Sequence, residues 1–207
     1  MERATVIALV CIGPNGEMAK DGKLMYNLPS DMYRFKTITT LYPNMIIGRK
    51  TFDEEYFPLD DRFHLVLTND KTHCPYIVPN VAYYNLDQIK QIITGNPTAT
   101  FCVIGGLSTY KALSPYVDNW IITMVEDPDI TDGNYTIFPY TDLVDETYRE
   151  ITRIEFNEND KISGRKLKYS IHEYRRNNQY ITSQEFYPAD FTTEKALPLD
   201  SPILKSK

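Results

Sequence analysis

The feature that most constrains the fold is an uninterrupted apolar run near the start of the chain, Thr5–Ile12, which reads TVIALVCI. The run has the length of a strand, is rich in β-branched residues, and carries no charged side chain on either face. Such a strand is typical of a sheet that is buried on both faces. Burial on both faces requires helices on each side, so the run predicts an α/β fold.

The rest of the chain agrees with this fold, because strand-length apolar runs alternate with helical patterns. Two late runs, residues 147–156 and 165–174, alternate in polarity and flank a turn at 157–160, which indicates an antiparallel pair. We therefore expect a three-layer α/β/α architecture with a mixed, mostly parallel central sheet and an antiparallel C-terminal hairpin. The other expected strands are residues 45–47, 62–68, 76–78, 81–84, 98–104 and 119–125, and helices are expected to begin near residues 29, 49, 86 and 108.

Local signals mark one helix start and two irregular segments. Asn85 and Gln88 have the spacing of a capping box, and Gly95 is expected to end the helix that they begin. Residues 13–25 and 126–140 are rich in turn-forming side chains, so we expect both to be irregular and the first to be mobile.

The chain is expected to form one domain, residues 1–176, followed by a C-terminal extension, residues 177–207. The extension has no clear periodicity, yet it holds more aromatic side chains than a solvating tail usually carries. It is therefore expected to be either disordered or docked on the body or on a neighbouring subunit. The protein itself is expected to be a monomer or a small homo-oligomer.

Composition excludes several classes of partner. A net charge of -6 at pH 7 argues against nucleic acid as the main partner, because phosphate binding needs a basic surface. No apolar segment is long enough to span a membrane, and the cysteines lack a CxxC pattern, which fits a reducing compartment such as the cytoplasm. The histidines lack metal-ligand spacing, so no metal site is expected.

A helix start that carries a carboxylate follows the first irregular segment. Pro29 suits the first helical position, and Ser30 or Asp31 could accept a hydrogen bond from a free backbone N–H. Leu28, Met32 and Phe35 form an apolar stripe, and Asp31 shares a face with Phe35. Asp31 is thus either an acid favoured by the helix dipole or a carboxylate that binds the donors of a flat heterocycle.

Two strand–glycine–helix junctions could bind phosphate, since backbone N–H groups point out of a helix start. One is Gly48 before Arg49, and the other is the Gly105–Gly106 pair. Neither matches a dinucleotide or Walker fingerprint, but two such junctions at the ends of neighbouring strands would fit a dinucleotide. Arg62 follows two aspartates and is either a solvated surface charge or a carboxylate-binding group.

Together these residues resemble dihydrofolate reductase, over residues 5–174. The order and spacing of the anchors make the resemblance specific: Tyr26-Asn27-Leu28-Pro29-Ser30-Asp31 with Phe35, Ile47-Gly48-Arg49-Lys50-Thr51-Phe52, Leu59 with Arg62, Leu67-Thr68, Val103-Ile104-Gly105-Gly106 with Tyr110, Thr123, and Phe138-Pro139. The resemblance implies an NADPH-dependent oxidoreductase of one-carbon metabolism that reduces 7,8-dihydrofolate to tetrahydrofolate by hydride transfer.

For the substrate, the resemblance implies that Asp31 hydrogen-bonds the pterin ring and favours protonation at N5, with Thr123 supporting the same group. Tyr26 replaces the usual tryptophan and keeps an aromatic ring and a hydroxyl donor, so it is assigned to the catalytic set. Arg62 is implied to hold the glutamate carboxylate. The implied apolar walls of the pocket are Ile7, Phe35, Leu59 and Ile104.

For the cofactor, the resemblance implies NADPH, preferred over NADH because Arg49 is present. Residues 13–25 are implied to form a lid over the nicotinamide. The implied cofactor-binding residues are Leu9 and Ala19 at the nicotinamide, Gly48, Arg49, Lys50 and Thr51 at the phosphates, Leu67, Thr68 and Asn69 near the adenosine, and Ile104, Gly105, Gly106, Leu107, Ser108, Thr109 and Tyr110 around the pyrophosphate.

Several departures from the family pattern leave alternatives open. Ala19 stands where glycine is usual, and Asp60 and Asp61 adjoin the carboxylate-binding arginine. Glu55 occupies a wall position that is apolar in the family. One alternative is a reductase of another pterin-like or pyrimidine ring. The other is a non-catalytic, reductase-like module for assembly.

Overall fold

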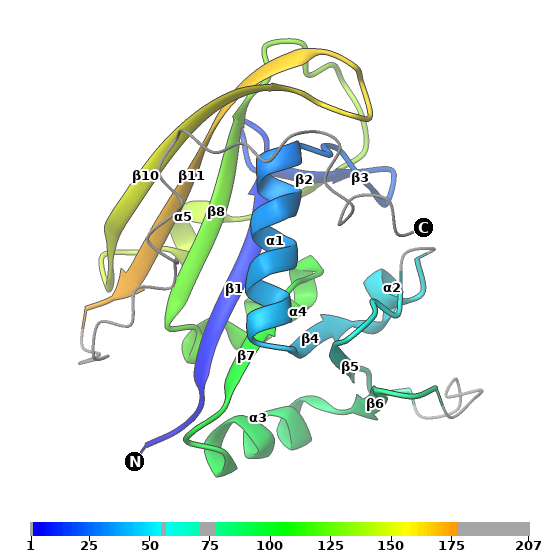
Figure 1. Ribbon diagram of the computed structural model, residues 1–207, viewed down its shortest axis with the longest axis vertical. Helices are drawn as coiled ribbons and strands as arrows, with labels where there is room; N and C mark the ends of the chain where they lie inside the picture. The colour runs from blue at the N-terminus through cyan, green and yellow to red at the C-terminus, as the bar shows by residue number, and fades with distance from the viewer. Residues whose placement is uncertain (1, 55–56, 71–77, 178–207) are drawn as a thin grey trace.

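The computed structural model describes residues 2–54, 57–70 and 78–177 (Figure 1). These residues form a main sheet in the strand order β10-β11-β8-β1-β7-β4-β5-β6 and a small sheet in the order β3-β2-β9. The strands are β1 (Thr5–Ile12), β2 (Glu17–Lys20), β3 (Lys23–Leu24), β4 (Asn44–Gly48), β5 (Phe63–Leu67), β6 (Val81–Tyr84), β7 (Thr100–Val103), β8 (Asn119–Glu126), β9 (Tyr135–Ile137), β10 (Tyr148–Asn159) and β11 (Lys166–Arg176). The helices are α1 (Pro29–Leu41), α2 (Arg49–Phe52), α3 (Leu86–Gly95), α4 (Leu107–Leu113) and α5 (Tyr140–Leu143), and a 3-10 turn spans Ser114–Tyr116.

The main sheet is mixed and mostly parallel. Strands β8, β1, β7, β4, β5 and β6 run parallel to one another, whereas β11 is antiparallel to both β8 and β10. The expected architecture, with its antiparallel C-terminal hairpin, is therefore confirmed.

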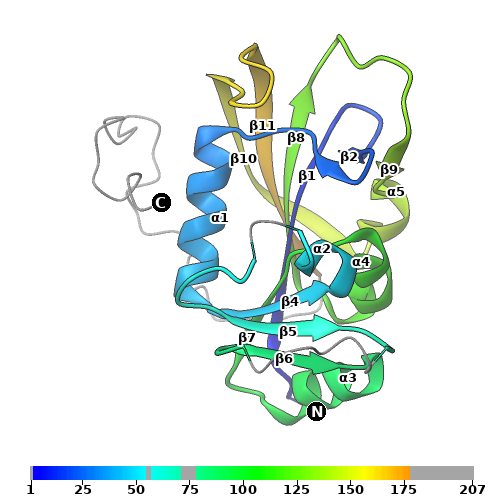
Figure 2. The same cartoon turned by 90° about the vertical axis from the view of Figure 1, so that its right-hand side faces the viewer.

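Strand β1 explains why helices cover both faces of this sheet. Side chains alternate along a strand, so Ile7 and Leu9 join one buried cluster while Val6, Ala8 and Val10 join the other. The first cluster includes side chains of α1, and the second includes side chains of α3 and α4. Figure 2 shows α1 and α4 on opposite faces of the sheet. The uninterrupted apolar run thus corresponds to a central strand buried on both faces, as expected.

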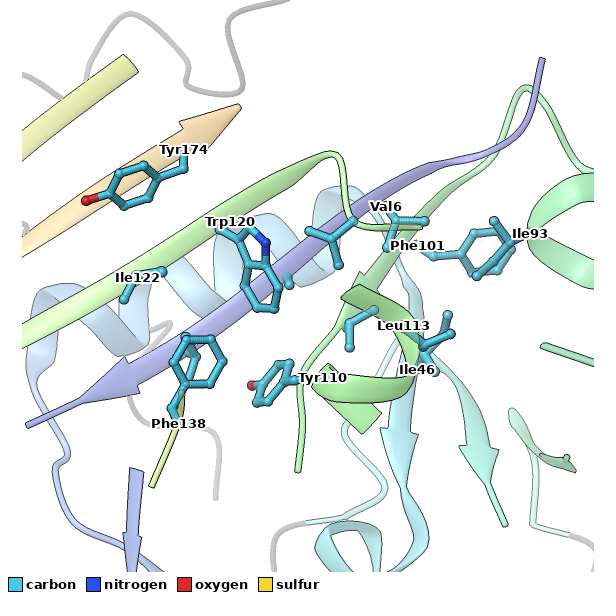
Figure 3. Close-up of a cluster of buried hydrophobic side chains, with 14 of the residues drawn as sticks. Val6, Ile46, Ile93, Phe101, Tyr110, Leu113, Trp120, Ile122, Phe138 and Tyr174 are labelled. Atoms are coloured by element: carbon cyan, nitrogen blue, oxygen red, sulfur yellow. The ribbon is translucent and has the colours of Figure 1, made fainter. Parts of the chain in front are cut away.

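Aromatic rings fill the core on the α4 side (Figure 3). The ring centres of Tyr110 and Trp120 lie 5.6 and 5.5 Å from that of Phe138, with both pairs edge to face. Tyr110 comes from α4, Trp120 from β8, and Phe138 from the segment after β9. This packing fixes α4, whose first residues adjoin the glycine pair, against the central strands.

The segments expected to be irregular instead pair with each other. Strand β2 pairs with β3 and, across a large sequence separation, with β9, where Ala19 faces Thr136. Local patterns did not reveal these strands because each is short and gains its partner only in the folded chain. Strand β10 also runs through Asn159, so residues 157–159 belong to the strand and only Asp160 remains of the expected turn.

The apolar stripe expected on α1 is partly wrong. Leu28 and Ile38 are buried and Phe35 packs against them, but Met32 is 39% exposed. A repeat of 3.6 residues places Asp31 between Phe35 and Ile38 around the helix and turns Met32 away. The acid is therefore nearer the centre of the buried face than the methionine.

Some expectations fall on residues that the structure does not describe. The weak strand expected at residues 76–78 lies largely outside the described residues, as does the extension beyond Asn177. None of the described helices combines the length and the apolar character needed to cross a membrane.

The capping box of α3 gives a test of how local sequence stabilises the fold. Asn85 accepts from the Gln88 backbone N–H at 2.9 Å, and its own N–H donates to the Gln88 side chain at 3.0 Å. We expect Asn85→Ala to lower the free energy of unfolding by about 1 kcal/mol, because one backbone donor loses its acceptor. Urea unfolding checks this value. Gln91→Ala, on an exposed position of the same helix, should leave stability unchanged, and equal losses in the two variants would contradict the capping role.

Candidate active site

The carboxylate of Asp31 lies where α1 meets β8. Asp31 is half-buried, and the hydroxyl of the fully buried Thr123 donates a hydrogen bond to its Oδ1. Burial raises the pKa of Asp31 above its ordinary value, although the Thr123 hydroxyl and the nearby Arg34 oppose the rise. The acid is therefore neither a solvated surface charge nor a simple helix-dipole partner, and the pocket interpretation is favoured.

An apolar cluster packs against the face of α1 that carries this acid. Ile7 and Leu9 of β1 are buried in one cluster with Leu28, and Phe35, Leu59 and Ile104 pack against the same cluster. The structure therefore brings together the side chains expected to form the apolar walls. Ile104 also contacts the neighbouring cluster of Ile47 and Phe52, so it connects the acid's surroundings to the end of β4.

Tyr26 belongs to the same cluster, but its hydroxyl points elsewhere. The ring is 7% exposed, and the hydroxyl lies 3.4 Å from Oδ2 of Asp127 rather than beside Asp31. Asp127 also accepts two 2.8 Å hydrogen bonds from Arg165. The ring thus packs in the same cluster as the expected wall residues, while the hydroxyl, which was assigned to the catalytic set, contacts Asp127 instead.

The two glycine junctions touch each other. Strands β4 and β7 are parallel neighbours, and the Gly48 N–H donates to the Gly105 carbonyl at 2.7 Å. A Cβ on Gly48 would lie 2.7 Å from Oγ1 of Thr109, and one on Gly106 would lie 2.8 Å from Oγ1 of Thr51. Both positions therefore exclude side chains, so the backbones of the two junctions pack directly against each other.

The polar groups of this edge fit a pyrophosphate. Gly48 and Gly106 are the N-cap residues of α2 and α4, and neither helix has a side-chain cap among the described residues. The Thr109 hydroxyl is fully buried and has no hydrogen-bond partner in the described part of the chain. Phosphate oxygens accept hydrogen bonds from donors of this kind, namely uncapped backbone N–H groups and a hydroxyl without a partner.

The remaining residues expected at the cofactor line the same edge of the sheet. Parallel strands β7, β4 and β5 all end there, so the segments that follow them lie side by side. Arg49 forms an ion pair with Asp53 at 3.1 Å, and the Tyr110 hydroxyl donates to the Leu9 carbonyl at 2.5 Å. Tyr110 thus supports the glycine pair from behind. The other expected residues at this edge are Lys50, Thr51, Leu67, Thr68, Asn69, Leu107 and Ser108, of which Lys50, Asn69 and Ser108 are exposed.

Arg62 is buried rather than solvated. It is 8% exposed, its Nη1 donates to the Asp60 carbonyl at 2.7 Å, and its Nε has no hydrogen-bond partner within the described residues. Burial lowers the pKa of Arg62, but a guanidinium remains charged at neutral pH. A buried cation with an unused donor fits a carboxylate-binding role and excludes the solvated-pair alternative.

Sequence reasoning missed the residues that hold the start of α1. Asp160 accepts from the Asn27 N–H at 2.7 Å, and Glu158 accepts from the Ser30 N–H at 3.0 Å. Ser30 was expected to cap the helix but instead donates its hydroxyl to Glu158. The only sequence signal was that the alternating pattern of β10 could extend through residues 157–159.

Of the departures noted above, Ala19 lies in β2, and Glu55 lies outside the described residues.

Comparison with known proteins gives one consistent family. The family model described as dihydrofolate reductase matches residues 5–176. Dihydrofolate reductase of Bacillus subtilis is 31% identical over 116 residues, which are 54% of this chain and 63% of that protein, so the match spans less than two thirds of that relative. Dihydrofolate reductase type 9 of Escherichia coli is 30% identical over 129 residues, which are 59% of this chain and 71% of that protein.

A solved structure is also similar. Dihydrofolate reductase from Enterococcus faecalis, complexed with NADP(H) and RAB-propyl, superposes with a TM-score of 0.63. The sequences are 20% identical, and the match covers 85% of this chain and 99% of the other, so the likeness concerns the fold. The family match over nearly all of the described residues shows that this chain belongs to the dihydrofolate reductase family.

Proposed function

We propose that this protein reduces 7,8-dihydrofolate to tetrahydrofolate with NADPH. The observation that carries the proposal is the half-buried Asp31, which Thr123 holds on the helix face that packs against an apolar cluster. Ile104 joins that cluster to the strand ends where the glycine pair lies. A flat heterocycle and a dinucleotide could therefore meet at one place.

NADPH, when bound, supplies the hydride for this reaction. Gly48, Gly105 and Gly106 would allow its pyrophosphate to approach the backbone, and the Thr109 hydroxyl would gain a partner. Arg49 and Lys50 follow Gly48 and would provide positive charge for the phosphates. Leu9 and Ala19 remain the residues proposed to border the nicotinamide, and residues 13–25 remain the proposed lid.

Asp31 would orient and polarise the substrate. Its carboxylate would accept hydrogen bonds from N3 and the 2-amino group of the pterin ring, and the negative charge would favour a proton on N5. The C6=N5 double bond becomes single when N5 gains a proton from water and C6 gains the hydride. Apolar walls that exclude bulk water strengthen the influence of the carboxylate on that proton.

The burial of Arg62 favours this substrate over other rings. A buried guanidinium with an unused Nε–H has a role in binding a substrate that carries a carboxylate tail, and none in binding a bare pterin or pyrimidine. The alternative of a non-catalytic assembly module gives no reason for the side-chain-free contact between the two glycine junctions. We further propose that residues 1–176 form the catalytic unit, a boundary supported by the end of the family match.

Replacing the acid tests the proposal directly. We expect Asp31→Asn to lower the rate of NADPH oxidation with dihydrofolate by about 10²- to 10⁴-fold at pH 7, because the neutral amide cannot favour the proton on N5. Activity should return in part at acidic pH, where the substrate is already protonated. Asp87→Asn, an exposed carboxylate on α3, is the matched control and should keep full activity.

Loss of folding should not explain the effect of Asp31→Asn. Burial raises the pKa of Asp31 in the folded protein, so the ionised acid destabilises the fold at neutral pH and the substitution should not lower the melting temperature. An Asp31→Asn protein with normal turnover on dihydrofolate would refute the proposed mechanism. A wild-type protein that binds NADPH but leaves dihydrofolate unreduced would favour another ring.

The hydroxyl of Thr123 should control the pH dependence. Its hydrogen bond favours the charged form of Asp31 and so lowers the pKa of the acid. We expect Thr123→Val to raise that pKa and to move the midpoint of the kcat/KM profile to higher pH, with about a tenfold loss in kcat/KM. Thr123→Ser keeps the donor and should retain the wild-type midpoint. A midpoint that moves downward in Thr123→Val would contradict this role.

The tail-binding role of Arg62 predicts a substrate-dependent loss. We expect Arg62→Leu to lower kcat/KM for dihydrofolate by about ten- to hundredfold, since charge-assisted hydrogen bonds to the carboxylate are lost. For 7,8-dihydropterin, which has no carboxylate tail, kcat/KM should be the same in Arg62→Leu as in the wild type. Arg149→Leu on β10 is the control: it makes the same replacement at an exposed arginine outside the proposed site. Equal losses on both substrates would assign Arg62 a structural role only.

A further inference from the structure

The helix that carries Asp31 begins without a cap of its own. Its N-cap residue is Leu28, which offers no side-chain acceptor, and Pro29 follows at the first helical position. The first N–H groups of a helix have no partner inside the helix and need an acceptor from outside. The start of α1 therefore depends on a group from elsewhere in the chain.

Glu158 on β10 provides that acceptor. Its Oε2 accepts the Ser30 N–H at 3.0 Å, and its Oε1 accepts the Ser30 hydroxyl at 2.5 Å. The two residues are 128 positions apart in the sequence. A carboxylate at a helix N-terminus also interacts favourably with the helix dipole. Glu158 thus caps α1 one residue before the acid of the proposed site.

The position of Glu158 is itself fixed. Oε2 also accepts the Tyr169 hydroxyl at 2.5 Å. Tyr169 is fully buried on β11, and its ring stacks on Phe156 with centres 5.1 Å apart. Both oxygens of Glu158 are therefore held, one by the helix alone and the other by the helix and the hairpin.

We propose that Glu158 is a positioning residue for Asp31, because its carboxylate caps α1 and holds the start of the helix against the β10–β11 hairpin. Asp31 is then located from two sides, by Thr123 on β8 and by Glu158 through Ser30. This inference deepens the proposed function and rests on it. It adds a second carboxylate beside the acid that binds the pterin ring.

The charge of Glu158 also acts on Asp31. Burial is the main cause of the raised pKa of Asp31, and the negative Glu158 adds to the rise, whereas the Thr123 hydrogen bond and the positive Arg34 lower it. Three other titratable groups lie near enough to Asp31 for its charge to raise their pKa: Cys11 on β1, Tyr110 on α4 and Tyr169 on β11. Burial raises the pKa of each group more strongly, so all three stay neutral at pH 7. Among the residues that the structure describes, Glu158 and Arg34 are therefore the neighbouring charges that shift the pKa of this acid.

The test uses Glu158→Gln, which keeps the shape and an oxygen acceptor but removes the charge. We expect the midpoint of the kcat/KM profile for dihydrofolate to move to lower pH, because a neighbouring negative charge no longer favours the proton. We also expect kcat to fall by about three- to tenfold, since the cap is weakened, while KM for NADPH stays unchanged. Glu155→Gln, an exposed position on the same strand, is the matched control and should show none of these changes.

Tyr169→Phe separates position from charge. It removes one hydrogen bond to Glu158 and keeps the carboxylate, so kcat should fall without a downward movement of the midpoint. It also keeps the test decisive if Glu158→Gln does not fold. Unchanged kcat in Tyr169→Phe, or a Glu158→Gln variant that loses thermal stability alone with an unchanged midpoint and kcat, would overturn the proposal.

A second measurement distinguishes this inference from the proposed function. Carbon-13 NMR titration of the Asp31 carboxyl in the full chain needs no substrate, and its midpoint should be lower in Glu158→Gln than in the wild type. If the wild type fails to reduce dihydrofolate but the titration moves as expected, the proposed function fails and the positioning role stands. If dihydrofolate is reduced but neither the titration nor the kcat/KM profile moves, only the positioning role fails.

Discussion

The hydrogen bond between Thr123 and Asp31 is the interaction on which the rest of the site depends. It joins a helix on one face of the sheet to a central strand, and it stabilises a carboxylate whose burial would otherwise be costly. Because Thr123 is paired in register with Cys11 of β1, the acid is tied to two neighbouring strands whose side chains are mostly buried. The position of a single carboxylate thus follows from the core.

The contact between the two glycine junctions is the second constraint. Gly48 and Gly105 share a hydrogen bond, and Gly48 and Gly106 lie too close to threonine hydroxyls to carry side chains. Backbone N–H groups from two helix starts therefore face the same edge, next to Ile104. Apolar walls on one side and backbone donors on the other suit a flat ring beside a dinucleotide, which is the chemistry that the proposed function needs.

Much of this could be predicted from local sequence. The double-faced burial of β1, the capping box of α3 and the C-terminal hairpin each follow from a period or a spacing over a few residues. Met32 and the small sheet of β2, β3 and β9 could not be predicted in this way. The outward turn of Met32 depends on which face of α1 meets the sheet, and the short strands depend on partners far away in the sequence.

The sequence by itself determined the strands of the main sheet, the helices α1 to α4 between them, the glycine junctions, and the acid and arginine that are candidates for binding a ligand. Only the tertiary structure decided that Arg62 is buried, that the Tyr26 hydroxyl turns to Asp127, and that Glu158 caps the helix of Asp31. The reason is physical. Periodicity is a property of neighbouring residues, whereas the desolvation and hydrogen bonding of a charged group depend on every element that packs around it.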